Sequence, residues 1–331
     1  METVVSGIRP TGNLHLGNYF GAMLNFLKMQ EEFHCFFFVA DYHSLTTHPH
    51  PANLHQTVQH VVAEYLACGL DPDKCTLYVQ SDLPETAELY LFLNMLSYVG
   101  ELERSTSFKD KIRKHPENVN AGLLTYPVLM ACDIIMHKAH KVPVGKDQEQ
   151  HLEMTRNFAS RFNRIYEVDY FPEPVAFNFS DKLVKVPGLD GSGKMGKSEG
   201  EGNAIFLIDE PDIIRKKVMK AVTDSGPTQQ NQEKPEVVQN LFKLLELVST
   251  AATIQHFEEV YNNCTIRYGD LKKQLAEDMI TFTAPIRERA RDIYNDAALL
   301  KKVLSQGAEK ARASGGKTVQ EVREIIGFRK F

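Results

Sequence analysis

The chain has 331 residues and a formal net charge of −5, and 43% of its residues are hydrophobic while 24% are charged. This composition is ordinary for a globular protein, and the length suffices for one large domain plus a smaller one. No apolar run approaches the ~18 residues of a membrane-spanning helix, and residues 1–10 lack the basic start and apolar core of a secretory signal, so we expect a cytoplasmic protein with no membrane partner.

Cysteines and basic residues narrow the possible classes further. The five cysteines are scattered without a Cys-x-x-Cys pair, so we expect reduced thiols and neither a disulfide framework nor a metal cluster. Basic side chains gather at residues 109–114 and 215–220. Because nucleic acids respond to local basic patches, the negative net charge does not exclude a nucleic-acid partner. A solvated charged face is the alternative interpretation of both runs.

Short apolar runs alternate with helical patterns in the first half of the chain. The predicted strands are residues 4–8, 35–40, 76–80 and 142–144, and the predicted helices are 17–31, 53–68, 86–98 and 147–165. The second strand holds three consecutive phenylalanines, which is typical of a parallel strand buried on both faces. The alternation predicts an α/β fold with a Rossmann-like, doubly wound parallel sheet. Residues 100–140 depart from it and indicate a helical insertion.

The second half of the chain is predicted to be helical, because strand patterns nearly vanish after about residue 209. One apolar stripe with the spacing of a long helix consists of Leu271, Leu275, Met279, Phe282 and Ile286. Pro285 lies within this helix and is a candidate kink. The Gly- and Lys-rich stretch 187–203 has the composition of a mobile loop. We therefore predict a nucleotide-binding domain at 1–190 and an all-helical domain at 191–331.

A glycine-rich loop follows the first predicted strand and leads into the first helix. Gly7, Gly12 and Gly17 let backbone approach a ligand closely, and the carboxyl end of the first strand of a doubly wound sheet is a nucleotide-binding position. The pattern is neither the dinucleotide GxGxxG nor the P-loop. Instead, residues 15–18 (HLGN) resemble the HIGH signature of class I aminoacyl-tRNA synthetases. The alternative is that the histidine before a glycine is a turn residue.

A lysine-containing loop lies far downstream, at residues 193–198 (GKMGKS). It resembles the second class I signature, KMSKS, although Gly196 stands where serine is usual. Lys194 and Lys197 can neutralise the charge of departing pyrophosphate, an interaction that is strongest in the transition state. A flexible basic linker is the alternative. The two motifs in this order are far more specific than either alone, and glycine should make the loop costlier to order.

Two further segments with recognisable patterns lie in the middle of the chain. Tyr126, Met130 and Asp133 are spaced to share one face of a helix, and residues 142–151 form a short strand that leads into another helix. With the segments 41–43, 100–104 and 223–225, these closely resemble bacterial tryptophanyl-tRNA synthetases, from residue 4 to about 226 and more loosely beyond. The resemblance implies a homodimer, an anticodon-recognising helical domain whose last helix packs back on the catalytic domain, and three substrates: L-tryptophan, ATP with Mg²⁺, and tRNA(Trp).

The resemblance also assigns roles to individual residues. Asp133 accepts a hydrogen bond from the indole N–H, and Tyr126 and Gln148 hold the amine. The other tryptophan-binding residues are Gly7, His43, Met130, Val142 and Val144. The catalytic residues are His15, Lys194 and Lys197. The ATP-binding residues are Arg9, Pro10, Thr11, Gly17, Asn18, Gly145, Lys146, Asp147, Val186, Lys194, Met195, Gly196, Lys197 and Ser198. Arg9 replaces a common glutamine, and contact with either phosphate or the substrate carboxylate stays open. No protein metal site is expected.

Three alternatives remain at this stage. Tyrosyl-tRNA synthetases share much of the pattern, but they carry glutamine at the position of Met130 and typically continue the Asp147-Gln148 segment with tryptophan. A nucleotidyltransferase of coenzyme biosynthesis would not need the helical second domain or the helix with Asp133. A non-catalytic paralogue that binds tRNA or tryptophan would be expected to have lost His15 or the lysine pair.

Overall fold

A parallel sheet lies at the centre of the computed structural model, which describes residues 1–114, 116–145, 148–179, 184–191, 193–196, 200 and 202–328. Within these residues the sheet has five strands in the order β3-β2-β1-β4-β5, and every neighbouring pair is parallel. The strands are β1 (Thr3–Ile8), β2 (His34–Val39), β3 (Cys75–Val79), β4 (Lys141–Val142) and β5 (Val175–Ala176).

The order of the strands creates a crevice at one edge of the sheet. The chain adds β2 and then β3 on one side of β1, and it returns to place β4 on the other side. Connections therefore leave the carboxyl ends of β1 and β4 in opposite directions, and the gap between them is where doubly wound folds bind ligands. β2 and β3 are buried along nearly their whole length, which agrees with their run of phenylalanine and other apolar residues.

Helices make up most of the remaining structure. In the described residues they are α1 (Leu16–Asn18), α2 (Leu24–Glu32), α3 (Asp41–Ser44), α4 (Pro51–Cys68), α5 (Glu85–Met95), α6 (Val99–Glu103), α7 (Thr106–Lys114), α8 (Ala121–Ile135), α9 (Glu149–Ile165), α10 (Pro211–Met219), α11 (Glu236–Val248), α12 (Ala251–Asn262), α13 (Tyr268–Asn295) and α14 (Ala297–Ile326). A π-helical segment, Tyr19–Met23, joins α1 to α2. Within the same residues, no helix is both long and apolar enough to cross a bilayer.

Two apolar cores cover the two faces of the sheet. Along β2, Phe37 and Val39 join a core with α2, α4 and the helices after residue 210, whereas Phe36 and Phe38 join a second core with α5, α8, α9 and α14. Alternate strand residues point to opposite faces, so the phenylalanine run supplies both cores. The insertion predicted at 100–140 is helical, as α6, α7 and α8. The predicted α/β class is therefore confirmed.

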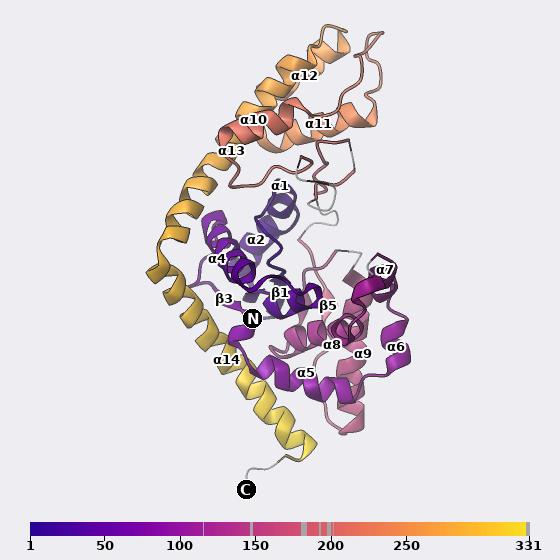
Figure 1. Ribbon diagram of the computed structural model, residues 1–331, viewed down its shortest axis with the longest axis vertical. Coiled ribbons are helices and arrows are strands. Elements are labelled where there is room, and N and C mark those ends of the chain that lie inside the picture. Colours follow the sequence, from indigo (N-terminus) through magenta and orange to yellow (C-terminus); the bar gives the residue numbers. More distant parts are fainter. Residues whose placement is uncertain are drawn as a thin grey trace.

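The helices of the second half extend away from the sheet and return to it. α10, α11 and α12 cluster with the start of α13 at one end of the molecule, as the orange part of Figure 1 and the two views together show. α13 then runs past α4, and α14 continues along β3 and α5. At Gly307 of α14 an added Cβ atom would lie 1.7 Å from the carbonyl oxygen of Leu77 in β3, so this helix approaches the sheet as closely as only glycine permits.

Three local predictions need correction or refinement. The helix predicted at 17–31 is divided by the π-helical segment, which places Tyr19 and Phe20 against Phe282 of α13 with ring centroids 5.4 and 5.3 Å apart. β5 was not predicted, because its two residues are exposed and only their pairing with β4 defines the strand. α13 continues through Pro285 to Asn295.

All five cysteines are free thiols, as expected.

Candidate active site

A cavity of about 280 Å³ opens at the carboxyl ends of β1, β2 and β4, facing α8. All eight residues predicted to bind tryptophan line it, and Arg9 and Gly145 from the predicted ATP site line it as well. These eight residues are Gly7, His43, Tyr126, Met130, Asp133, Val142, Val144 and Gln148. The fold thus brings together segments that lie more than a hundred residues apart in the sequence, at the crevice that strand order predicts.

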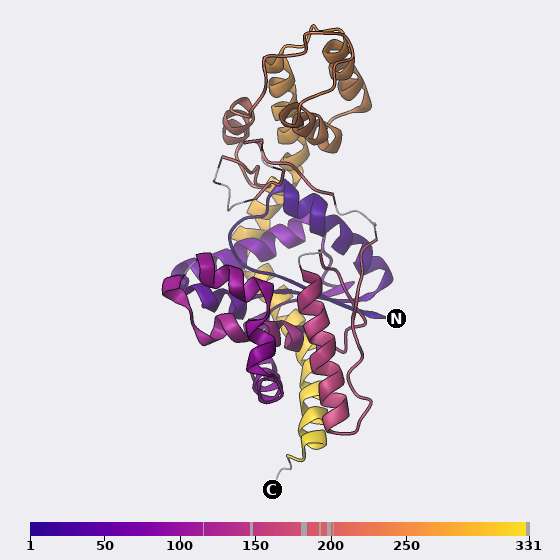
Figure 2. The same ribbon diagram turned by 90° about the vertical axis from the view of Figure 1, so that its right-hand side faces the viewer.

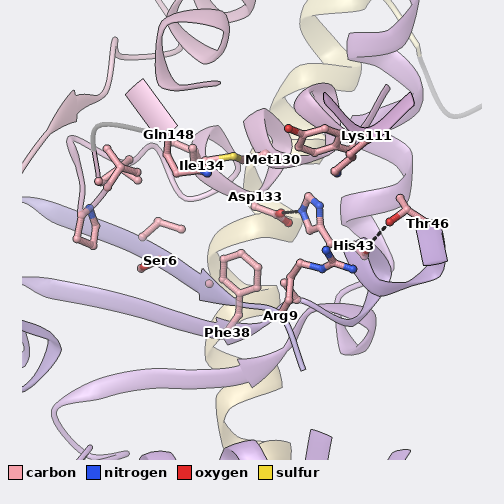
Figure 3. Close-up of a pocket in the computed structure, with 18 residues that line it drawn as sticks. Ser6, Arg9, Phe38, His43, Thr46, Lys111, Met130, Asp133, Ile134 and Gln148 are labelled. Atoms are coloured by element: carbon pink, nitrogen blue, oxygen red, sulfur yellow. Dashed lines mark hydrogen bonds and ion pairs between the residues drawn. The ribbon is translucent and has the colours of Figure 1, made fainter. Parts of the chain in front are cut away.

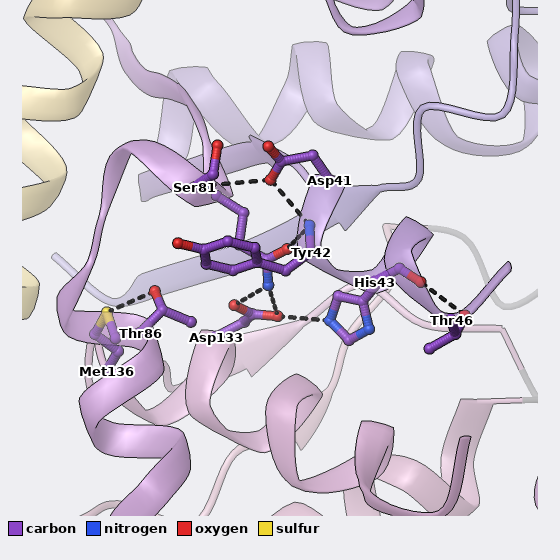
Figure 4. Close-up of polar contacts among 9 residues, drawn as sticks. Asp41, Tyr42, His43, Thr46, Ser81, Thr86, Asp133 and Met136 are labelled. Atoms are coloured by element: carbon purple, nitrogen blue, oxygen red, sulfur yellow. Dashed lines mark hydrogen bonds and ion pairs between the residues drawn. The ribbon is translucent and has the colours of Figure 1, made fainter. Parts of the chain in front are cut away.

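Asp133 lies at the buried end of this cavity, on α8. Asn120 caps the helix by accepting a hydrogen bond from the backbone N–H of Leu123 (3.1 Å). Three turns further on, the Asp133 carboxylate accepts hydrogen bonds from Gln80 Nε2 at 2.7 and 2.9 Å and contacts His43 Nε2 at 2.9 Å. Figure 4 shows this carboxylate between its partners. Burial raises the pKa of Asp133, and the hydrogen bonds from His43 and Gln80 oppose that rise.

The contacts of Asp133 leave room for one further donor. An ionised carboxylate offers about four acceptor positions, and Gln80 and His43 occupy three of them. Gln80 is itself held, because its Oε1 accepts a hydrogen bond from the backbone N–H of Tyr42 (3.1 Å). A ligand with a single N–H that reaches this end of the cavity therefore meets an acceptor of fixed position.

Apolar side chains line two sides of the cavity. Figure 3 shows Phe38 on one side of the cavity and Met130 with Ile134 on the other. The Phe38 ring lies directly against Gly7, where an added Cβ would be 2.4 Å from the ring atom Cζ. A side chain at position 7 would therefore displace this ring.

A hydrogen-bond network lies at the opposite end of the cavity. The Tyr126 hydroxyl makes short contacts with both His151 Nε2 and Ser107 Oγ. His151 Nδ1 is 3.0 Å from Gln148 Oε1, and Ser107 Oγ is 2.9 Å from His151 Nε2. Tyr126 and Gln148, the two residues predicted to hold an amine, are therefore joined through His151, which is 3% exposed.

Two cations face the same cavity. Lys111 Nζ lies 3.8 Å from the centroid of the Tyr126 ring, and burial together with the charge of Arg9 lowers the pKa of Lys111 to about 8. Burial also lowers the pKa of Arg9, whose Nε has no hydrogen-bond partner within the described residues. Such positions favour an anionic group of a ligand, because it would restore the interactions that burial removes.

The two basic runs noted in the sequence have different surroundings in the structure. Lys111, from the run 109–114, lines the cavity and is no part of a solvated face. In the second run, Lys217 Nζ pairs with Asp209 at 2.7 Å and Arg215 pairs with Glu277 at 2.6 Å. Much of that charge is therefore neutralised within the chain.

The first signature segment lies at the start of α1. His15 caps this helix: its Nδ1 accepts from Asn18 N–H (3.3 Å), while Asn18 Oδ1 accepts from His15 N–H (3.1 Å). The buried carboxylate of Glu64 accepts a hydrogen bond from the backbone N–H of Leu14 at 2.7 Å and so fixes the residue before His15. An added Cβ at Gly17 would be 2.8 Å from His15 Nδ1, so only glycine fits there.

The second signature segment packs next to the first. Met195 is buried, and its backbone N–H donates to the carbonyl of Val186 (2.7 Å), while Lys194 is exposed. The carbonyl oxygen of Met195 would lie 3.5 Å from a Cβ added at Gly17. The chain that follows is bonded to the first motif by two backbone pairs, Leu16 N–H to Ile205 O (3.0 Å) and Leu207 N–H to Leu14 O (2.8 Å).

The remaining predicted residues are placed as follows. Pro10 is buried and Thr11 exposed on the loop after β1, and Gly196 is half-buried after Met195. Lys146, Asp147, Lys197 and Ser198 lie outside the described residues. Across the described ranges, no group of three or more His, Cys, Asp or Glu side chains is placed to hold a metal ion.

Comparison with known proteins identifies the family. Residues 2–284 match the family described as tRNA synthetases class I (W and Y). A tryptophan–tRNA ligase of Porphyromonas gingivalis is 65% identical over 329 residues, which cover 99% of this chain and 100% of that protein. The chain belongs to the tryptophanyl-tRNA synthetases of class I.

Further relatives of the tryptophanyl-tRNA synthetase family agree. A tryptophan–tRNA ligase of Helicobacter pylori is 44% identical over 330 residues, covering 99% of both chains. The crystal structure of the Campylobacter jejuni tryptophanyl-tRNA synthetase, complexed with ADP and tryptophan, superimposes with a TM-score of 0.88 at 33% identity and covers 98% of this chain and 99% of that one. The resemblance inferred from the sequence motifs is therefore confirmed.

Sequence reasoning missed three residues of this tryptophanyl-tRNA synthetase site: Gln80, Lys111 and His151. Gln80 follows directly after buried β3, and a polar residue at the carboxyl end of a parallel strand is a recognisable signal. Lys111 was assigned to a charged run, because its sequence neighbourhood does not reveal that α7 turns this side chain inward. His151 lies within a segment that carries the resemblance, but its contacts depend on α7 and α8.

Proposed function

We propose that this chain activates L-tryptophan with ATP, forming tryptophanyl-adenylate and pyrophosphate, and then transfers tryptophan to the 3′ end of tRNA(Trp). The observation that carries the choice of amino acid is Asp133, a buried carboxylate with one remaining acceptor position at the end of a cavity that also has apolar side chains on two sides. A site built around a buried acceptor rejects ligands that lack the matching donor. The side chain of phenylalanine has no N–H to offer, and the hydroxyl of tyrosine reaches a different point.

The charges in the cavity suit the other end of the amino acid. A bound tryptophan would place its indole between Phe38 and Met130, with its ring N–H toward Asp133. Its ammonium group would then meet the acceptors of Tyr126 and Gln148. Its carboxylate would face the side of Arg9 and Lys111, where positive charge is concentrated. This favours contact of Arg9 with the substrate carboxylate over contact with phosphate alone.

Adenylate formation needs positioning and neutralisation of charge, and no protein nucleophile. A carboxylate oxygen of tryptophan attacks the α-phosphorus of ATP, and the bond to the β-phosphate breaks to release pyrophosphate. We assign stabilisation of the developing charge to His15, Lys194 and Lys197, and we add Lys111. Gly17 and the adjoining loop would receive the nucleotide beside α1. The adjacency of the two signature segments supports this assignment.

The second step uses the tRNA. The terminal adenosine, through its 2′-hydroxyl as is usual in class I, attacks the activated carbonyl, and AMP leaves. Mg²⁺ would enter with ATP and be held mainly by phosphate oxygens, since it retains most of its water ligands. We assign anticodon recognition to the helices after residue 190, and the site of action to the cytoplasm, where charged tRNA is consumed.

The proposed assembly is a homodimer. Exposed apolar side chains follow one another along α5, the connection after it and the start of α6: Leu91 is 51%, Met95 74%, Tyr98 62% and Val99 58% exposed. Contiguous exposed apolar residues mark interaction surfaces, and a second copy of the chain is the simplest partner under closed symmetry.

Pyrophosphate exchange with each of the twenty amino acids tests the proposed function. Exchange that depends on tryptophan and is absent with tyrosine supports it. Exchange with tyrosine alone would assign the chain to the sister specificity. A lack of exchange with every amino acid, in protein that is folded, would argue for a binding protein or a different nucleotidyl transfer.

A further inference from the structure

We infer that His151 is a positioning residue that makes both Tyr126 and Gln148 hydrogen-bond acceptors toward the cavity, and that this arrangement selects the ammonium group of the amino acid. The inference rests on the proposed function and deepens it. His151 itself is buried at 3% exposure on α9 and lies behind the two residues that line the cavity. Its action is therefore exerted through them.

The contact with Gln148 fixes the tautomer of His151. Gln148 Oε1 lies 3.0 Å from His151 Nδ1, and an amide oxygen can only accept, so Nδ1 carries the proton. In a neutral ring, Nε2 is then an acceptor. The Gln148 oxygen has two lone pairs, so it can accept from His151 and from a ligand together.

The contacts among Tyr126, Ser107 and His151 determine where the Tyr126 hydroxyl donates its proton. Three hydroxyl or ring atoms lie within hydrogen-bond distance of each other: Tyr126 Oη, Ser107 Oγ and His151 Nε2. Tyr126 donates either to Nε2 or to Ser107 Oγ, which has Ser105 Oγ at 2.8 Å as a further partner. In both arrangements the Tyr126 hydroxyl donates its hydrogen bond within the network, and the Tyr126 oxygen presents lone pairs to the cavity.

Acceptors matter here because the cavity is otherwise cationic at this end. Lys111 lies over the Tyr126 ring at 3.8 Å, and Arg9 lines the same cavity. An ammonium group that enters meets two like charges, so it needs neutral oxygens that present only lone pairs. If Tyr126 or Gln148 could turn a proton toward the ligand, the preference for an ammonium group would decrease.

Three substitutions separate the contact at Nδ1 of His151 from the contacts at its Nε2. His151→Asn places an amide near the position of Nδ1 and keeps a donor for Gln148, whereas His151→Gln reaches the position of Nε2 and keeps an acceptor for Tyr126. His151→Phe preserves the ring shape and removes both. The control is Gln80→Met, which acts on the opposite end of the cavity through Asp133.

Binding can be measured directly, because the chain contains no tryptophan and the indole fluorescence of a ligand is therefore unobscured. Dissociation constants of tryptophan and of indole-3-propionate, which lacks the amine, are compared for each variant. His151→Phe is expected to weaken tryptophan binding by about 10- to 100-fold, the cost of misdirected hydrogen bonds to a charged group, while indole-3-propionate changes by less than about threefold. The Asn and Gln variants should each retain part of the preference. Gln80→Met should weaken both ligands alike.

One result would overturn the inference: the ratio of the two dissociation constants in His151→Phe stays at its wild-type value, whether both ligands keep their affinity or lose it equally. If that variant does not fold, the polar Asn and Gln variants carry the same test, and a wild-type ratio in both contradicts the inference. If the wild type binds tryptophan and supports exchange, but the variants keep the wild-type ratio of dissociation constants, only the role of His151 is disproved. Wild-type protein that neither binds tryptophan nor supports exchange disproves the proposed function.

Discussion

At the scale of single residues, the carboxylate at the buried end of the cavity is held by partners behind it. Gln80 and His43 hold Asp133, and the backbone of Tyr42 holds Gln80. Removing the water from a buried carboxylate is costly, so an Asp133 without these donors would take up a proton or turn away. The partners keep one acceptor position aimed at the ligand, and a single missing partner should therefore affect specificity more than stability.

Lys111 gives the site a pH dependence. Burial, together with the charge of Arg9, lowers the pKa of Lys111 to about 8 in the protein without substrates. Because the cationic form attracts carboxylate and phosphate, kcat/KM for ATP should fall as pH rises through about 8 and this cation is lost. Lys111→Arg should keep kcat/KM level to higher pH, and Lys111→Met should be low and level throughout. An alkaline limb that persists unchanged in Lys111→Met would assign it to another group.

At the scale of elements, tight packing fixes where the last helix sits. Gly307 of α14 touches the carbonyl of Leu77 in β3, and neighbouring side chains reinforce the contact, since Arg312 donates to the carbonyl of Asp82 (2.6 Å) and His137 bridges Tyr78 and Ser314 at 3.0 Å each. α14 therefore covers the β3 edge of the sheet. A helix that begins more than a hundred residues after the predicted boundary thus shares a core with the strands of the sheet.

Substituting glycines of α14 tests this packing. Gly307→Ala should destabilise the protein by about 3 kcal/mol, because the added methyl group overlaps backbone that cannot move without shifting β3. Gly316→Ala is the matched control: its nearest neighbour would be the far end of Glu85 at 3.7 Å, and better helix propensity should stabilise the protein by up to about 1 kcal/mol. Thermal denaturation of both variants measures this difference in stability. Equal melting temperatures would contradict the close approach of α14 to β3.

The sequence predicts those elements whose characteristic pattern lies within the element itself. β2 and β3 are buried on both faces, so their apolar runs identify them without knowledge of their neighbours. The face shared by Tyr126, Met130 and Asp133 is a property of one helix and is found from spacing alone. β5 and the inward direction of Lys111 depend on contacts between distant segments, and no local pattern encodes them. The π-helical turn that places Phe20 against Phe282 is likewise set by a helix more than two hundred residues later.

At the scale of the whole molecule, one continuous core connects the sheet to the helices of the second half. Leu16 from the first signature and Leu14 just before it share this core with Met195 from the second and with Leu275 of α13. A movement of the helices relative to the sheet would therefore be felt at both signature segments, because packed interiors transmit strain.

The proposed dimer surface also belongs to this scale. Met95→Glu places a charge at the most exposed apolar position of α5 and should convert a dimer into monomers at micromolar concentration, as sedimentation velocity would show. Met219→Glu on α10 makes the same chemical change at a residue that is 41% exposed and should leave the association state unaltered. Dissociation by both substitutions, or by neither, would remove the α5–α6 surface from the account.

The pairing of Asp133 with a ring N–H is tested most directly by replacing that N–H with oxygen. Pyrophosphate exchange is measured with tryptophan and with 3-(benzofuran-3-yl)alanine, for the wild type and for Asp133→Ala. The wild type should favour tryptophan by at least about 100-fold in kcat/KM, and Asp133→Ala should lose most of this preference through its effect on tryptophan. A wild type that activates both amino acids equally well, or an Asp133→Ala variant that keeps the full preference, would contradict the assignment of the pocket.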